Sequence, residues 1–119
     1  MRKPRKRLLC IDDEPMGLAL RKTFLELAGY DVRIAGSGGE GVKLVASQPF
    51  DAVILDYNMP GRNGGFVATT IKMIRHRLPI IMLSGAISVP ARTLGAIDGF
   101  IGKGQSPALL LSKIQELLA

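Results

Sequence analysis

Apolar and polar positions alternate along this chain in blocks that predict strands and helices in turn. Five short and almost wholly apolar runs have the length and composition of strands buried on both faces: Leu8–Ile11, Val32–Ala35, Ala52–Leu55, Ile80–Leu83 and Gly99–Ile101. The segments that follow these runs carry apolar residues three and four positions apart, which is the spacing of amphipathic helices. The alternation predicts an α/β fold, a parallel sheet with helices on both faces.

Glycine and proline residues lie where the predicted helices and strands begin or end. Gly29 follows the apolar stretch "FLELA", at a position where a helix commonly ends in a residue with positive φ. Pro79 opens the fourth predicted strand, and Pro107 suits the first turn of the last helix. With 119 residues and neither an internal repeat nor a linker, the chain is expected to form one domain.

The net charge of +6 comes almost entirely from the N-terminus. Five basic residues precede the first strand, namely Arg2, Lys3, Arg5, Lys6 and Arg7, and the remainder of the chain is close to neutral. We interpret residues 1–6 as a solvated basic tail, while a contact with phosphates or acidic lipids stays open. Aromatic side chains that would stack on bases are absent from the tail, so the domain is not expected to bind nucleic acid.

Residue types that often signal a metal or redox site are scarce. Cys10, the only cysteine, lies in an apolar strand and is expected to be a buried, inert thiol. His76, the only histidine, lies between two arginines at a predicted helix end, where we expect solvation. The chain has no apolar run of the roughly 18 residues that a membrane span needs, nor a signal-type N-terminus. A cytoplasmic protein without a membrane partner is therefore expected.

Polar residues follow four of the predicted strands directly. The first strand is followed by Asp12 and Asp13, the third by Asp56, the fourth by Ser84 and the fifth by Lys103. Because parallel strands end at the same edge of a sheet, these side chains are expected to meet there. Strand ends are often polar merely because they reach solvent, but that explains an adjacent aspartate pair together with a third aspartate, a serine and a lysine poorly.

Three carboxylates at one edge of a sheet call for a cation. Mg²⁺ takes carboxylate and carbonyl oxygens and often a substrate phosphate as well. A lysine holds a phosphate as a point charge, a serine donates a hydrogen bond to it, and an aspartate carboxylate can itself become phosphorylated. The predicted edge is therefore suited to phosphoryl chemistry with Mg²⁺.

Four segments, taken in order, resemble the receiver domain of bacterial two-component response regulators. They are "LLCIDDEP", "VILDYNMPGRNGG", "PIIMLSGA" and "GFIGKG", and the resemblance extends from about Arg7 to Leu118. It implies a flavodoxin-like (βα)5 doubly wound sheet with strand order 2-1-3-4-5, with the receiver occupying residues 7–119. It also implies a signalling module rather than an enzyme, acting only on its own phosphorylation and dephosphorylation.

The resemblance assigns roles to individual residues. Asp56 would accept a phosphoryl group from the phosphohistidine of a histidine kinase or a histidine phosphotransfer protein. Asp13, Asp56 and the carbonyl of Asn58 would hold Mg²⁺, with Asp12 acting directly or through water. Ser84 and Lys103 would bind the phosphoryl oxygens.

A switch and an output surface are implied by the same resemblance. Phe100 matches the aromatic switch position of the family, although a plain core role stays open for it. The fourth helix, fifth strand and fifth helix would contact a downstream protein, an output domain or a second copy in a homodimer. The last helix, "ALLLSKIQELLA", is more apolar than one buried face requires, which agrees with such a surface. Gly104 departs from the family, which usually has proline after the lysine, and favours a more flexible loop there.

Two enzyme classes stay open as alternatives. "GSGGEG", residues 36–41, fits the glycine pattern of dinucleotide-binding enzymes, with Asp56 as a ribose ligand. In the predicted strand order, however, this stretch follows an edge strand, so we interpret it as a turn in which Gly36 and Gly38 supply backbone freedom and Ser37 caps a helix. A Mg²⁺-dependent phosphohydrolase also uses a strand-end aspartate, but usually has a second aspartate where this chain has Asn58.

Overall fold

Strands and helices alternate along the whole described chain, as the hydrophobic pattern predicts. The computed structural model describes residues 4–59, 63–85 and 89–119. Within them the strands are β1 (Arg7–Ile11), β2 (Asp31–Ala35), β3 (Ala52–Asp56), β4 (Ile80–Ser84) and β5 (Gly99–Gly102). The helices are α1 (Pro15–Leu27), α2 (Gly38–Ser47), α3 (Gly64–Ile74), α4 (Ala91–Gly95) and α5 (Pro107–Leu117). Residues 1–3 of the predicted basic tail lie outside the described residues.

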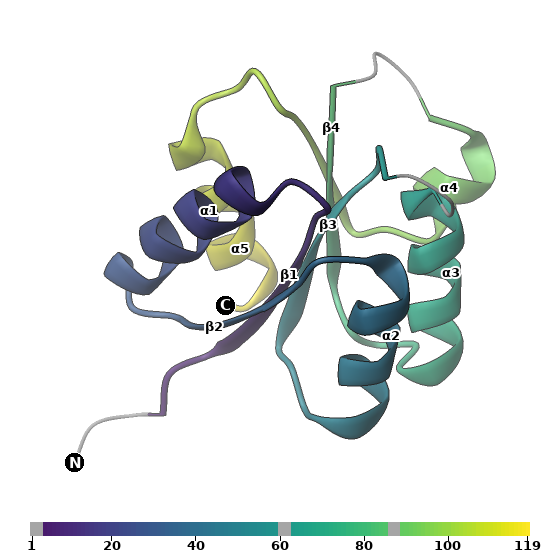
Figure 1. The fold of residues 1–119 in the computed structure, drawn as a ribbon, viewed down its shortest axis with the longest axis horizontal. Helices are drawn as coiled ribbons and strands as arrows, with labels where there is room; N and C mark the ends of the chain where they lie inside the picture. Colours follow the sequence, from purple (N-terminus) through teal and green to yellow (C-terminus); the bar gives the residue numbers. More distant parts are fainter. Residues whose placement is uncertain (1–3, 60–62, 86–88) are drawn as a thin grey trace.

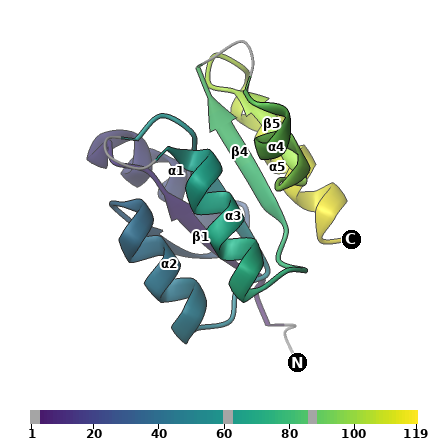
Figure 2. The same cartoon turned by 90° about the vertical axis from the view of Figure 1, so that its right-hand side faces the viewer.

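The five strands form one parallel sheet in the order β2-β1-β3-β4-β5, which confirms the predicted doubly wound, flavodoxin-like arrangement. Helices α1 and α5 cover one face of the sheet, and α2, α3 and α4 lie on the other (Figure 1). Figure 2 shows α2 and α3 lying alongside the sheet on their shared face. The carboxyl ends of all five strands therefore point to one edge of the sheet.

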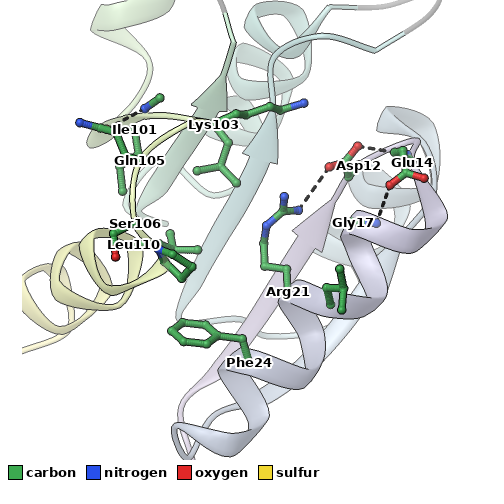
Figure 3. A pocket seen from close by; sticks show the side chains of 14 residues that line it. Asp12, Glu14, Gly17, Arg21, Phe24, Ile101, Lys103, Gln105, Ser106 and Leu110 are labelled. Atoms are coloured by element: carbon green, nitrogen blue, oxygen red, sulfur yellow. Dashed lines mark hydrogen bonds and ion pairs between the residues drawn. The ribbon is translucent and has the colours of Figure 1, made fainter.

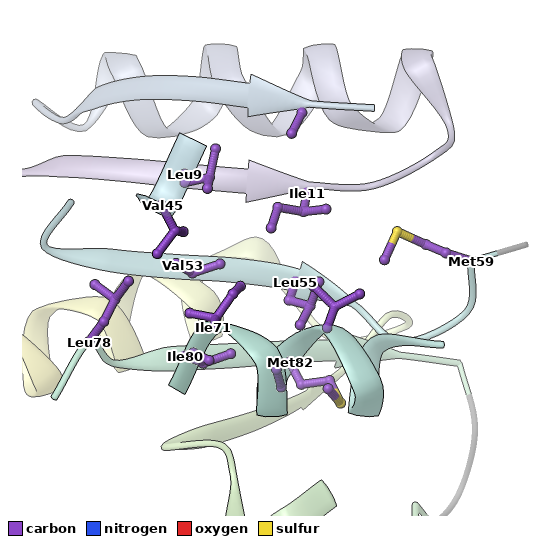
Figure 4. Close-up of a cluster of buried hydrophobic side chains, with 13 residues drawn as sticks. Leu9, Ile11, Val45, Val53, Leu55, Met59, Ile71, Leu78, Ile80 and Met82 are labelled. Carbon is purple, nitrogen blue, oxygen red and sulfur yellow. The ribbon is translucent and has the colours of Figure 1, made fainter. Parts of the chain in front are cut away.

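The apolar runs supply both halves of the core because successive side chains of a strand point to opposite faces. On the α2–α3 face, Leu9 of β1, Leu55 of β3 and Met82 of β4 pack with Ile71 of α3 (Figure 4). On the α1–α5 face the intervening strand residues pack against Leu25 and Ile114, among others. Burial on both faces explains why these strands are continuous apolar runs. Cys10 is fully buried, as predicted.

The glycine-rich stretch is the turn into α2, but the predicted role of its glycines is wrong. Among the described residues only Gly29 has positive φ (104°), so Gly36 and Gly38 supply no left-handed turn. Gly38 instead allows close packing, because a Cβ there would collide with Val67 of α3, and a Cβ at Gly41 would collide with Ile11 of β1. Ser37 caps α2 as predicted, since its hydroxyl accepts a hydrogen bond from the N–H of Glu40.

Helix α4 is short, with five residues. Pro90 precedes it without a capping side chain, and the helix reaches only to Gly95, whose helix propensity is low. In the described part of the chain, no helix combines the length and the apolar character that a membrane span requires.

Candidate functional site

The carboxyl ends of β1, β3, β4 and β5 bring the predicted site residues to one edge of the sheet. Asp12 directly follows β1, and β1 pairs with β3, which ends in Asp56. Asp56 stands opposite Leu83 in the register of β4, and Ser84 stands opposite Gly102 of β5. The N–H of Lys103 donates to the carbonyl of Ser84 at 2.9 Å. Strand pairing thus places residues from four distant parts of the sequence next to one another.

Asp56 lies at the centre of this edge and is nearly inaccessible to solvent. Its side chain is 1% exposed, and its Oδ1 lies 2.7 Å from Nζ of Lys103. The same oxygen accepts a hydrogen bond from the N–H of Asn58 at 3.2 Å. The other face of Lys103 meets solvent, with 38% of its side chain exposed. A buried carboxylate is therefore paired with a lysine that is partly exposed to solvent.

Asp12 is the second buried acid, and both of its oxygens are engaged. Oδ1 accepts a hydrogen bond from the N–H of Glu14 at 3.1 Å. Oδ2 lies 3.3 Å from Nη1 of Arg21, which comes from the middle of α1. The side chains of Asp12 and Arg21 are 3% and 16% exposed, so this ion pair is largely removed from solvent.

Asp13 completes a group of three carboxylates. One oxygen from each of Asp12, Asp13 and Asp56 lies within 4.8 Å of the others, and Asp13 itself is exposed. Carboxylate oxygens at this spacing fit a hard divalent cation such as Mg²⁺. With Lys103 and Arg21 as the neighbouring cations, the carboxylates carry more charge than these two side chains balance.

The two buried acids titrate in opposite directions. Burial raises the pKa of Asp56 above its ordinary value, and the neighbouring Asp12 raises it further, against the lowering effect of Lys103. Burial also acts to raise the pKa of Asp12, but hydrogen bonds from the N–H of Glu14 and from Asp56, together with the charge of Arg21, hold it below its usual range. Two close acids with divergent pKa values are typical of functional sites.

Ser84 and Phe100 lie deeper in the sheet. Ser84 is fully buried at the end of β4. Phe100 stands opposite Met82 in the β4–β5 register, and it is half-buried against the core cluster on the α2–α3 face. Its ring thus belongs to the face that carries α4.

The segment after Asp56 is held by a close approach of α3. The N–H of Gly64 donates to the carbonyl of Tyr57 at 2.9 Å. A Cβ at Gly64 would lie 2.7 Å from the carbonyl oxygen of Asp56, so only glycine fits there without movement of the backbone. Residues 60–62, including Pro60 of the "NMPG" motif, lie outside the described residues.

Two residues at this edge have roles that the sequence analysis does not foresee. Glu14 is the cap of α1 and accepts hydrogen bonds from the N–H groups of Met16 and Gly17. Arg21 is absent from the predicted site altogether. A signal for it exists: Arg21 falls three residues after Leu18 and four before Leu25, in the buried stripe of α1. A charge in such a stripe needs a buried partner.

Comparisons with known proteins agree with this geometry. The family model of the response regulator receiver domain matches residues 8–115. The chain belongs to the response regulator receiver domain family. It is 31% identical over 115 residues to the transcriptional regulatory protein PrrA of Mycobacterium bovis, which covers 94% of this chain and 49% of PrrA. The receiver therefore spans about half the length of the curated relatives that it matches.

Solved receivers share the whole fold. A CheY-like response regulator receiver domain protein from Methanospirillum hungatei is 32% identical, with a TM-score of 0.92 and coverage of 97% of this chain and 94% of that one. The response regulator TrrA from Thermotoga maritima, solved in complex with Mg²⁺-BeF, is 34% identical, with a TM-score of 0.90 and coverage of 95% and 99%. Both likenesses cover nearly the whole of each chain.

Proposed function

We propose that Asp56 accepts a phosphoryl group from the phosphohistidine of a histidine kinase or a histidine phosphotransfer protein, and that the phosphorylated receiver signals to a downstream partner. The observation that carries this proposal is the buried Asp56 carboxylate, with Lys103 at 2.7 Å and two further aspartates beside it. The complex of TrrA with Mg²⁺-BeF supports the same use of the site in a receiver that is 34% identical.

The carboxylate group fits Mg²⁺ by its donor atoms and spacing. Asp13, Asp56 and the backbone carbonyl of Asn58 would hold the ion, and Asp12 would contribute directly or through a water molecule. When bound, the ion offsets negative charge on the phosphoryl oxygens and on the clustered carboxylates.

The chain's own residues supply the nucleophile and its positioning. A carboxylate oxygen of Asp56 attacks phosphorus, an oxygen–phosphorus bond forms, and the nitrogen–phosphorus bond breaks with its electron pair returning to the imidazole of the donor. Lys103 already contacts the Asp56 carboxylate and would move to a phosphoryl oxygen once the carboxylate is phosphorylated. The hydroxyl of Ser84, at the end of the adjacent strand, would donate to a second phosphoryl oxygen.

Phosphorylation would be transmitted through Phe100. A phosphoryl group adds about 1.5 to 2 negative charges and new hydrogen-bond acceptors. Movement of Ser84 toward it would vacate space beside β4, into which the half-buried ring of Phe100 could turn from the neighbouring strand. The outward result would be a changed surface on α4, β5 and α5.

This surface is where we place the downstream partner, the output domain or a second copy of the chain. Leu94 of α4 and Leu109 of α5 are 50% and 44% exposed, so both helices present apolar side chains to solvent that the core does not bury. We assign the receiver to residues 7–119 and a basic tail to residues 1–6. We expect a cytoplasmic signalling domain without turnover of external substrates, and no contact of the domain with nucleic acid or membrane.

A phosphorylation assay tests the proposal. The protein is incubated with Mg²⁺ and acetyl phosphate, and its intact mass is compared with that of Asp56→Asn under the same conditions. A single phosphoryl adduct in the wild type, absent from the variant, is expected. Continuous hydrolysis of a small phosphate ester would instead indicate a phosphohydrolase, and tight binding of a dinucleotide or flavin would indicate a cofactor enzyme; either result overturns the proposal.

A further inference from the structure

Arg21 has an unusual place for a surface-helix arginine. It lies on the buried stripe of α1 between Leu18 and Leu25, and only 16% of its side chain is exposed. Figure 3 shows its guanidinium extending along α1 toward Asp12, from the same side as Phe24 and across the cavity from Leu110. Because an arginine remains charged in proteins, the guanidinium cannot be neutralised by losing a proton and needs a nearby negative charge.

The pairing with Arg21 places a positive charge on an acid that is proposed to contribute to the metal site. Oδ2 of Asp12 faces Nη1 of Arg21 at 3.3 Å, and Oδ1 accepts the hydrogen bond from Glu14 at 3.1 Å. Each carboxylate oxygen has two lone pairs, so Mg²⁺ or its water would either share Asp12 with these donors or displace one of them. In both cases the ion competes with the guanidinium for the negative charge of Asp12. The ion pair with Arg21 involves a flexible side chain, whereas the N–H of Glu14 is held in place by the turn into α1.

A cavity beside Arg21 gives its side chain room to withdraw. This cavity, of about 520 Å³, lies between α1 and the β5–α5 segment. Its walls include Phe24, Ile101 and Leu110, and Asp12 and Lys103 lie at the same cavity. The guanidinium can therefore leave Asp12 without unfolding the helix that carries it.

We propose that Arg21 is an internal competitor of Mg²⁺ at Asp12, which neutralises this acid in the metal-free receiver and lowers the affinity of the site for the ion. The inference rests on the proposed metal site and assigns a regulatory residue to it. Two effects act together: the guanidinium and the ion compete for one carboxylate, and the ion enters a site that already has a positive charge nearby. Removing Arg21 should therefore tighten Mg²⁺ binding, although it removes a contact from the fold.

The test is a titration of the unphosphorylated protein with MgCl₂ at constant ionic strength, followed through the NMR signals of the Asp13 and Asn58 amides. Arg21→Met keeps an unbranched apolar chain along the cavity wall and should bind Mg²⁺ about tenfold more tightly than the wild type, the low end of what a neighbouring charge does to a carboxylate equilibrium. Arg21→Lys, which retains the charge, should fall between the two.

Lys22→Met is the matched control. It removes one positive charge from the next position of α1, where Lys22 pairs with Glu26 at 2.9 Å and lies half-exposed. Its Mg²⁺ affinity should stay within twofold of the wild type. Equal or weaker binding by Arg21→Met than by Lys22→Met overturns the inference about Arg21. If the amide signals of Asp13 and Asn58 in the wild-type protein do not shift with Mg²⁺, the proposed metal site itself is overturned.

Thermal unfolding with and without Mg²⁺ provides a second readout. Without the metal, Arg21→Met should unfold at a lower temperature than the wild type, because Asp12 loses its buried counter-ion. Saturating Mg²⁺ should raise the unfolding temperature of Arg21→Met by more than that of the wild type. If Arg21→Met folds only with Mg²⁺, that dependence supports the inference; a smaller Mg²⁺ effect in Arg21→Met than in the wild type contradicts it.

Discussion

The ammonium nitrogen of Lys103 lies 2.7 Å from Oδ1 of Asp56, at a point where the aspartate is buried and the lysine still reaches solvent. The two residues come from the ends of β3 and β5, with β4 between them. Their contact keeps a cation next to the carboxylate before any phosphoryl group arrives.

Replacing Lys103 with alanine should slow phosphorylation of Asp56 by acetyl phosphate by about a hundredfold, the usual effect of removing one preorganised charge partner from a transition state. The measurement is the rate at which the phosphoryl adduct appears in the intact mass. Lys113→Ala is the control, because Lys113 pairs with Glu116 on α5 and its side chain is 31% exposed. A Lys103→Ala rate within a few-fold of the wild type would contradict the assigned role.

The raised pKa of Asp56 predicts a pH-dependent gain in stability for Asp56→Asn. A carboxyl whose pKa is higher in the folded state binds its proton more tightly there, so its contribution to stability falls as the pH rises from the ordinary aspartate range through the folded value. Asparagine does not ionise, so its contribution to stability does not fall as the pH rises. Without metal, the variant should be more stable at neutral pH by roughly 1–2 kcal/mol, the size expected from relieving a close like-charge pair.

This gain should vanish when the pH drops below the ordinary aspartate range, where Asp56 is protonated in both folded and unfolded chains. Asp12, whose pKa is lowered partly by its hydrogen bond with Asp56, adds the opposite slope at acidic pH, so the difference between the two stability curves reports on Asp56 together with its coupling to Asp12. Urea unfolding from acidic to neutral pH measures it. A difference that is flat with pH would show that the folded pKa of Asp56 is not raised.

Phe100→Ala should separate phosphorylation from its readout. Phe100 packs against the core cluster of the α2–α3 face, so the rate of labelling by acetyl phosphate should stay within about threefold of the wild type. The change in amide hydrogen exchange of α4, β5 and α5 on phosphorylation should be lost. Loss of phosphorylation itself would indicate that Phe100 supports the site rather than the switch, and an unchanged exchange response would leave it a plain core residue.

The positions of the strands follow from the sequence because β1, β3 and β4 are buried on both faces, and such strands must be continuous apolar runs. Their order is implied by the resemblance to receiver domains and not by the apolar pattern. Each observed strand lies within one residue of its predicted bounds at either end. The meeting of Asp12, Asp13 and Asp56 follows in turn, because parallel strands end at the same edge. In both cases the sequence is sufficient because the parallel arrangement of the strands brings their carboxyl ends together.

Features that depend on how one helix packs on another are not visible in the same way. Gly38 and Gly41 fit a turn as well as a close contact until the positions of Val67 and Ile11 are known. Arg21 lies nine residues after Asp12, and their contact depends on the direction of one long side chain. Sequence patterns locate elements, while these contacts are properties of the assembled layers.

Cys10 offers a probe of unfolding because burial raises its pKa to about 12. At pH 8 its sulfur is a neutral thiol inside the sheet and should not react with a thiol-specific reagent over hours. In denaturing urea the same single cysteine should react fully within minutes. Rapid labelling of the folded protein would mean that β1, the second strand from the edge, opens far more easily than its burial implies.

The packing role of the α2 glycines can be tested within one helix. Gly41→Ala places a methyl group against the side chain of Ile11 in the core, and overpacking of this kind should destabilise the protein by about 1–3 kcal/mol. Gly39→Ala is the matched control, since a Cβ there meets nothing within 4 Å and alanine favours the helix. It should leave stability unchanged or raise it by up to about 1 kcal/mol. Urea unfolding of both variants measures the difference, and equal effects would show that backbone entropy, rather than the contact of α2 with β1, accounts for the glycine at position 41.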